Sequence, residues 1–210
     1  MKASKEVVKK PKDTGKKPSG QVPLYSFSIE LKGVKPKIWR YFYVPSDISL
    51  TRFHAALQCV MGWFGGHLYS FTISGVEYYE EFVDPIGPSP DEGKRSGLAK
   101  IRLDRLGLSK GSRFTYLYDM GDAWDHVIKV LDTDYVPKVP GRNYGCFKGE
   151  RACPPEDCGG VYGYQELLEI QEDPNREEYE DMMDWVGGPI DPEEFDVERV
   201  HFRLNYNKLT

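Results

Sequence analysis

Three of the four cysteines lie close together in the segment 145–160, "GCFKGERACPPEDCGG". Cys146, Cys153 and Cys158 have the spacing C-x6-C-x4-C. A structural zinc ion takes about four sulfur or nitrogen ligands, so three thiols need one more donor. His126 is the natural candidate, because it sits on a predicted strand just before this segment. We therefore expect either a structural zinc site of three cysteines and one histidine, or free and packed thiols. A disulfide is the least expected state in a reducing compartment.

A second group of chemically active side chains lies in "YDMGDAWDH", residues 118–126. Asp119, Asp122 and Asp125 surround a turn, and His126 follows them. Clustered carboxylates beside an imidazole suit a divalent Mg or Mn ion that assists hydrolysis. The alternative is that these aspartates serve the turn, because Asp side chains bond the turn backbone. Alternation along a strand directs Asp125 away from His126, so at most two of the aspartates can join that histidine.

Several other side chains are candidates for a site. Glu156 and Asp157, next to the cysteines, could join the carboxylates above or cap a helix that begins near residue 162. Arg40 follows Trp39 in a predicted strand and could face an anion or a partner, although a salt bridge at the sheet edge is the simpler expectation. Outside the zinc set, the candidate site residues are Asp119, Asp122, Glu156, Asp157, Trp39, Arg40 and Trp124.

The elements that must position these residues are predicted from hydrophobic periodicity. Apolar and polar residues alternate in several strands separated by turn residues. These strands cover 24–31, 37–45, two stretches within 67–80 about a Ser74-Gly75 turn, 113–118 and 124–132. Hairpin connections imply antiparallel pairing. The fold class is therefore α+β, a largely antiparallel sheet built from hairpins with helices packed on one face and two C-terminal helices.

The helices are predicted from spacing and caps. Residues 49–63 have apolar side chains at helical spacing, with Ser49 as the N-cap and Gly62 as the stop. On this helix we expect Cys59 to pack and His54 to be half-exposed, and Trp63 and Phe64 to pack beyond it. Two further helices are predicted over 162–173 and 176–187, an irregular or short helical segment over 98–108, and a strand or extended tail over 196–209.

Composition bounds the class of protein. Hydrophobic residues make up 40% and aromatic residues 13% of the 210, which indicates a folded domain, and the apolar runs are too short to span a membrane. We expect a disordered, Lys-rich leader over 1–22, a single domain over 23–210 and a cytoplasmic location. The first twenty residues carry a net charge of +5, which leaves −10 on the rest. Nucleic acid is thus expected to bind only through the leader.

Three strings resemble the signature blocks of the plasmid pRi open-reading-frame-three-like family. They are "KPKIWRYFYVPSDISLTRFHAALQCVMGW", "YLYDMGDAWDHVI" and "CFKGERACPPEDCGGVYGY". The resemblance extends over about residues 22–205. It implies a domain of unknown function that is found on plasmids and near insertion elements, and it brings no established catalytic residues. Some members are labelled transposon resolvases, but this chain has no serine-recombinase nucleophile segment.

Three functions follow from these observations. The first is a small non-catalytic binding or scaffold domain, whose aromatic sheet face and acidic helices dock a protein partner. The second is a metal-dependent, hydrolase-like enzyme with its site between the 118–126 turn and the 146–160 loop. The third is a DNA-associated accessory protein that uses the Lys-rich leader. No G-x-S-x-G, H-E-x-x-H or Walker-type signature is present to favour a known enzyme class.

Overall fold

The computed structural model describes residues 22–79 and 97–206. The expected leader, residues 1–22, therefore lies outside the described residues except at residue 22. Residues 83–97, whose polar sequence rich in proline and glycine predicts a loop, lie outside them except at residue 97. The division into a leader and one domain stays a prediction. Within the described residues, every helix is too short or too polar to traverse a bilayer.

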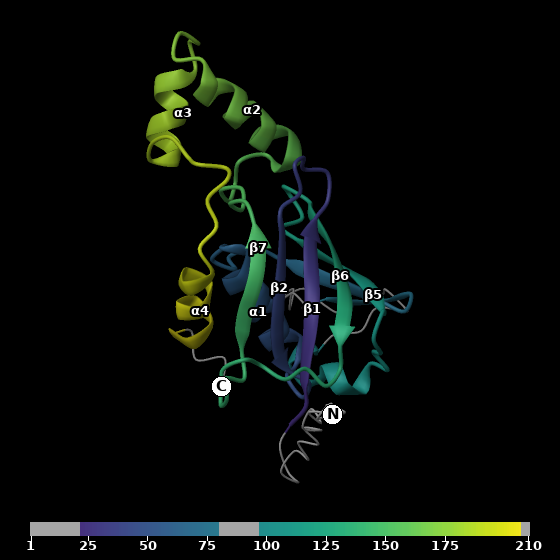
Figure 1. Cartoon of the computed structure of the whole chain (residues 1–210). Helices are drawn as coiled ribbons and strands as arrows, with labels where there is room; N and C mark the ends of the chain where they lie inside the picture. Colours follow the sequence, from purple (N-terminus) through teal and green to yellow (C-terminus); the bar gives the residue numbers. More distant parts are fainter. Residues whose placement is uncertain (1–21, 80–96, 207–210) are drawn as a thin grey trace, which may run out of the picture.

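One seven-stranded sheet forms the centre of the structure (Figure 1). Its strand order is β4-β3-β5-β6-β1-β2-β7, and every neighbouring pair is antiparallel. The expected α+β class with an antiparallel, hairpin-built sheet is confirmed. The strands are β1 (Leu24–Leu31), β2 (Trp39–Pro45), β3 (Tyr69–Ile73), β4 (Val76–Tyr79), β5 (Arg113–Tyr118), β6 (Trp124–Asp132) and β7 (Gly145–Glu150).

Helix α1 (Leu50–Met61) covers one face of this sheet and ends as the sequence predicts. The Ser49 side chain accepts a hydrogen bond from the Arg52 amide, and Gly62 adopts a left-handed φ of 118° that closes the helix. The fully buried Phe53 packs its ring 5.1 Å from that of Phe27 and 5.7 Å from that of Phe71. Burying one such side chain contributes about 1.5–3 kcal/mol, so α1 is held mainly by its apolar face. Two 3₁₀ turns, Leu98–Lys100 and Leu103–Arg105, fill the segment expected to be short and helical.

Strand β7 was not anticipated, because "GCFKGE" lacks clear alternation and two of its residues are glycines. These glycines are needed where the strand passes large side chains. A Cβ at Gly145 would lie 2.5 Å from the Tyr43 Oη, and one at Gly149 would lie 2.6 Å from Arg40 and 2.7 Å from Phe195. Pairing with β2 therefore makes this segment a strand, a tertiary effect that local propensity does not reveal.

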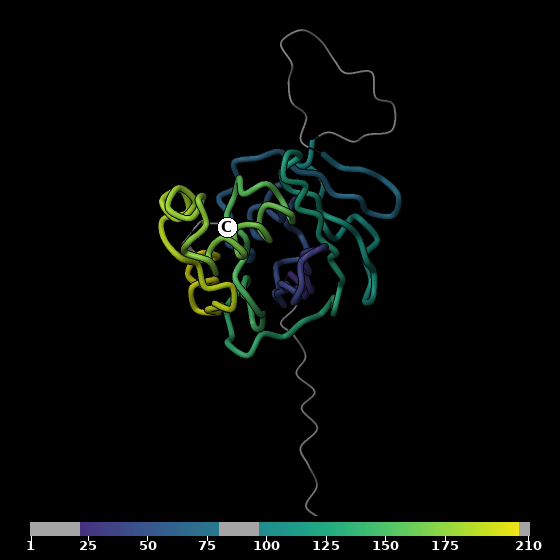
Figure 2. Tube along the Cα trace, turned by 90° about the horizontal axis from the view of Figure 1, so that it is seen from above, coloured from purple at the N-terminus to yellow at the C-terminus, as the bar shows by residue number. Residues whose placement is uncertain are grey.

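The last part of the chain that the structure describes, residues 160–206, contains three helices, whereas two were predicted. Helices α2 (Gly160–Glu172) and α3 (Tyr179–Val186) confirm the two that were predicted. The prediction of a strand or extended tail over 196–209 is wrong for its described part, because that part forms helix α4 (Val197–Tyr206). The Asp196 side chain caps α4 by accepting from the amides of Glu198 (2.8 Å) and Arg199 (3.3 Å), and Val200 and Leu204 bury one face at helical spacing. Figure 2 shows α2, α3 and α4 gathered on one side of the molecule, and Figure 1 places α4 beside edge strand β7.

Candidate functional site

The structure places His126, the expected fourth zinc ligand, in the core of the sheet. His126 alternates with Trp124 and Ile128 on the buried face of β6, and its side chain is fully buried. Its Nδ1 lies 3.2 Å from the Tyr116 carbonyl oxygen, and its ring meets Trp63 edge-on at 5.3 Å. Burial lowers the pKa of His126 to about 4, so its imidazole is neutral near pH 7.

The three thiols of the expected zinc set belong to different environments. Cys146 lies buried on β7, where its thiol donates to the Lys148 carbonyl at 3.6 Å, whereas Cys153 and Cys158 lie in the following loop. None of the four cysteines forms a disulfide. Burial raises the pKa of Cys146 to about 11 and of Cys158 to about 12, so these thiols are protonated near neutral pH. Within residues 22–79 and 97–206, the histidine and these cysteines do not form a group whose ligand atoms approach within 4.8 Å of one another.

The structure does bring together the two sequence strings that carry the candidate carboxylates. The Tyr118 hydroxyl donates to Glu156 at 2.5 Å, and the Gly159 amide donates to Asp122 at 3.2 Å. Glu156 also accepts from the Phe64 amide at 3.1 Å. Neither acidic residue of the loop caps α2, which begins without a side-chain cap. Glu156 instead joins the loop to β5, and Asp122 accepts from the backbone just before α2.

A histidine that the sequence analysis did not select lies at this junction. His67 places its Nδ1 3.6 Å from Asp119 and its Nε2 3.3 Å from Asp157. Among the described residues, these three form the one group with histidine, cysteine or carboxylate ligand atoms within 4.8 Å. Asp119 is held at a φ of 57° while its side chain accepts from the Gly121 amide at 2.8 Å. One signal in the sequence could have identified His67. It follows Gly65 and Gly66 in a loop, so no alternation along a strand directs its side chain into the core.

Arg40 has a structural role instead of facing an anion or an edge carboxylate. Its side chain is 2% exposed and its guanidinium lies 4.4 Å from the centre of the Phe195 ring. It donates to four backbone carbonyls, those of Val60, Trp39, Glu150 and Arg151. A buried cation needs such acceptors, because leaving its donors unpaired is costly. The expected salt bridge is therefore replaced by hydrogen bonds that join β2, α1 and the end of β7.

The face of the sheet opposite α1 carries a row of aromatic rings, which we call the aromatic row. It consists of Trp39, Tyr41, Phe147, Tyr135 and Tyr43, with successive ring centres 4.6, 5.9, 5.3 and 5.0 Å apart. In Figure 1 the helices of the described chain leave this side of the sheet uncovered. Phe147 is 41% exposed, and the nearby loop contributes two exposed valines, Val136 and Val139.

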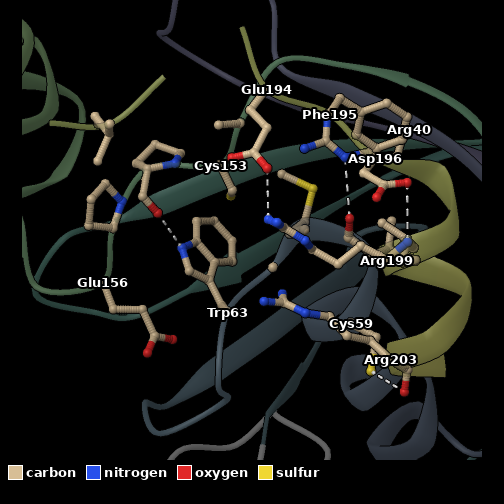
Figure 3. Close-up of a pocket in the computed structure, with 18 of the residues that line it drawn as sticks. Arg40, Cys59, Trp63, Cys153, Glu156, Glu194, Phe195, Asp196, Arg199 and Arg203 are labelled. Atoms are coloured by element: carbon tan, nitrogen blue, oxygen red, sulfur yellow. Dashed lines mark hydrogen bonds and ion pairs between the residues drawn. The ribbon is translucent and has the colours of Figure 1, made fainter. Parts of the chain in front are cut away.

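Two adjoining pockets lie between α1 and α4. The first, which we call the Cys153 pocket, has a volume of about 390 Å³ and includes Arg40, Cys153 and Phe195 in its wall (Figure 3). The second, which we call the Gln58 pocket, has a volume of about 650 Å³ and includes His54, Gln58 and Gly65. Both are lined by Cys59, Trp63, Phe64 and Arg203.

The walls of these pockets correct two expectations. His54 is only 8% exposed and stacks on Tyr69 at 3.6 Å, so it is buried and not half-exposed. Phe64 is 88% exposed at the mouth, whereas Trp63 is buried and donates to the Pro154 carbonyl at 2.9 Å. The glycines on either side of these two residues let the chain leave α1 so sharply that only Trp63 reaches the core. Cys59 is buried, as expected.

Comparison with known proteins places the chain in a family. An uncharacterised protein, y4hQ, from Sinorhizobium fredii is 36% identical over 162 residues, which is 76% of this chain and 78% of that protein. A crystal structure of MM3350, a protein of unknown function from Methanosarcina mazei Go1, superposes with a TM-score of 0.70 and 31% identity, and the match covers 83% of this chain and 96% of that one. The profile of the plasmid pRiA4b ORF-3-like proteins matches residues 23–199. The chain therefore belongs to the plasmid pRiA4b ORF-3-like protein family.

Proposed function

We propose that this chain is a non-catalytic binding domain that docks a protein partner on the aromatic row. The observation that carries this proposal is the continuous run of rings from Trp39 to Tyr43 on the open face of the sheet. Aromatic side chains are enriched in protein interfaces because they bury a large area and lose little conformational freedom. An exposed apolar surface that includes Phe147, Val136 and Val139 also has an energetic reason to be covered.

The chemistry of the other polar groups favours binding over nucleophilic catalysis. Burial raises the pKa of the Cys146 and Cys158 thiols, whereas a cysteine nucleophile needs a lowered pKa. Burial lowers the pKa of His54 to about 4, and its Nδ1 bonds a tyrosine hydroxyl that is itself fully buried. A net charge of −10 beyond residue 20 disfavours a nucleic-acid backbone as the occupant of the aromatic row.

The proposal is tested by replacing one ring of the row. Phe147→Glu places a charge in the centre of the proposed interface, and Tyr162→Glu is the matched control, because Tyr162 is 87% exposed on α2 and lies outside the row. A partner is first identified by cross-linking to the wild-type chain and then purified for titration. We expect Phe147→Glu to weaken its affinity at least about tenfold and Tyr162→Glu to leave it unchanged. Equal affinity for both variants would show that the partner docks elsewhere.

A second candidate function, metal-dependent hydrolysis, is favoured by the group of His67, Asp119 and Asp157. One imidazole and two carboxylates are a ligand set that suits Mn²⁺ or Zn²⁺. The group lies between the 118–126 turn and the 146–160 loop, where the sequence predicts the site of a hydrolase-like enzyme. His67 takes the place beside the carboxylates that was predicted for His126. In this alternative the cation would polarise a bound substrate or activate a water molecule.

Metal titration separates the two functions. Mn²⁺ binding to the full chain is followed by electron paramagnetic resonance for the wild type, Asp157→Asn and Glu166→Gln, the last of which removes an exposed charge from α2. If the group is a metal site, Asp157→Asn weakens binding at least about tenfold and Glu166→Gln does not. A similar weak affinity in all three proteins would make this group a structural contact and would rule out a metal-dependent enzyme at this place.

Three expectations remain predictions. The Lys-rich leader, through which DNA was expected to bind, lies outside the described residues, so an accessory role on DNA gains no support from the contacts above. The cytoplasmic location and a structural zinc ion held by the cysteines also stay predictions.

A further inference from the structure

The Gln58 pocket has a feature that the proposed function does not use, an unpartnered polar atom in its wall. The Gln58 side chain is 95% buried, since the residue is 5% exposed. Its Nε2 donates to the Tyr116 hydroxyl at 2.8 Å, but its Oε1 is buried and has no hydrogen-bond partner. Buried amide oxygens are rarely left unpaired, because the lost hydration is not replaced. A ligand N–H group entering the pocket would supply the missing donor.

The hydrogen bonds behind Gln58 set the protonation of His54. An amide nitrogen only donates, so the buried Tyr116 hydroxyl accepts from Gln58 and must place its own proton on another acceptor. That acceptor is the Nδ1 of His54, at 2.7 Å. His54 therefore carries its proton on Nε2. This nitrogen faces Gly65 in the pocket wall, because a Cβ added to Gly65 would lie 3.5 Å from it. The pocket thus presents an imidazole N–H donor.

A positive charge completes the pocket. Arg203 of α4 lines both pockets, and Figure 3 shows its side chain in the Cys153 pocket. No carboxylate of residues 22–79 or 97–206 is recorded within ion-pair distance of it, whereas its neighbour Arg199 is paired with Glu194 at 3.0 Å. An arginine that lines a cavity without an anionic partner is suited to hold a carboxylate by paired hydrogen bonds.

These three groups define one ligand chemistry. Arg203 and the His54 N–H can bind an anion, and the Gln58 oxygen can accept a hydrogen bond from an N–H donor. Trp63 and Phe64 form an apolar part of the pocket wall. We infer that the Gln58 pocket binds a free carboxylate that has an amide N–H on the adjacent carbon, as in an N-acylated amino acid or at the C-terminus of a peptide. A cavity of about 650 Å³ has room for one or two such residues. This site is separate from the aromatic row.

Calorimetric titration of the full chain with matched probes tests the inference. The probes are N-acetylphenylalanine, its carboxamide, which lacks the charge, and its N-methyl derivative, which lacks the N–H. We expect the carboxamide and the N-methyl probe each to bind at least about tenfold more weakly than N-acetylphenylalanine. A hexapeptide ending in phenylalanine, with a free or amidated C-terminus, shows whether the natural source is a chain end. Tighter binding of the free hexapeptide than of the single residue indicates a chain end, and equal or weaker binding indicates an amino acid derivative.

Variants then assign the contacts. Arg203→Gln should remove the preference for the free carboxylate, and Gln58→Leu should remove the preference for the N–H probe. Arg199→Gln, the matched control one turn away on α4, should keep both preferences. The inference is overturned if the acid and carboxamide bind equally to the wild type, if Arg199→Gln behaves like Arg203→Gln, or if no probe binds at millimolar concentration. None of these results affects the Phe147 experiment, so the two proposals fail separately.

Discussion

His126 and His67 are connected through the packed rings of Trp63 and Tyr118 but have contrasting surroundings. The ring of His126 is fully buried and meets Trp63 edge-on, with its Nδ1 on the Tyr116 carbonyl. The ring of His67 meets Tyr118 edge-on at 5.8 Å but is partly exposed and lies between two carboxylates. The first histidine is fixed by a strand that leaves it no route to solvent, and the second by a loop that brings together three distant segments.

This difference shows that residues which are neighbours in sequence need not face one another in the folded chain. The three aspartates and His126 are neighbours along the chain, but the alternation of β6 sends the histidine into the core and Asp125 to an ion pair with Lys32 at 2.6 Å. His67 and Asp157 are 90 residues apart and meet through tertiary packing. We call the core around His126 the buried region, and the group of His67, Asp119 and Asp157 the rim. The following three predictions test whether the buried region stabilises the fold and whether the rim is a binding site.

The largest effect is expected from Trp124→Ala in the buried region. Trp124 is fully buried beside Trp63, and removing such a side chain leaves a cavity that costs about 3–5 kcal/mol. The free energy of unfolding is measured by urea titration. Trp185→Ala is the control, because Trp185 is 50% exposed on α3, and we expect it to cost less than about 1 kcal/mol. Equal losses would mean that the region around His126 is not the tight core described above.

An intermediate effect is expected from acid. The pKa of His126 is about 4 in the folded chain, below its ordinary 6.5, because burial disfavours the charged ring. As the pH falls, His126 is protonated in the unfolded chain before it is protonated in the folded chain. Its contribution to the free energy of unfolding is therefore complete above about pH 6.5, and about 3 kcal/mol of it is lost as the pH falls toward 4. His54, whose pKa is also lowered to about 4, acts in the same direction.

His126→Gln isolates this contribution. The free energy of unfolding is compared at about pH 7.5 and about pH 4.5 for the wild type and the variant, and we expect the acid-induced loss to be smaller in the variant by about 2–3 kcal/mol. Carboxylates also titrate in this range, but they do so in both proteins. The same loss in both would mean that His126 is charged or solvated in the folded chain.

The smallest effect on stability is expected at the rim. His67→Ala removes the contacts of a partly exposed ring with the buried Asp119, at 3.6 Å, and with the exposed Asp157, at 3.3 Å, and we expect the loss to be about 0–1 kcal/mol. If the rim is a metal site, the same substitution weakens Mn²⁺ binding far more than it lowers the free energy of unfolding. A loss of stability above about 2 kcal/mol would instead make His67 a structural residue like His126.

Much of the fold was predictable because local signals agreed with the tertiary structure. The strands 24–31, 113–118 and 124–132 have the expected bounds, and Ser49 and Gly62 cap α1 as their residue types require. The failures have physical reasons. Strand β7 exists through its pairing with β2, and α4 has too little apolar surface to be recognised until α1 and β7 cover it.

The sequence by itself determined most of the helices and strands, with β7 and α4 as exceptions, together with the antiparallel hairpins and the residues of β6 that share a face. These follow from periodicity, turn residues and side-chain size, which act over a few residues. Tertiary structure alone decided that His67 joins Asp119 and Asp157, that Arg40 bonds backbone carbonyls, and that Gln58, His54 and Arg203 line one pocket. Those contacts join residues from separate elements, and which of them meet depends on how the helices pack against the completed sheet.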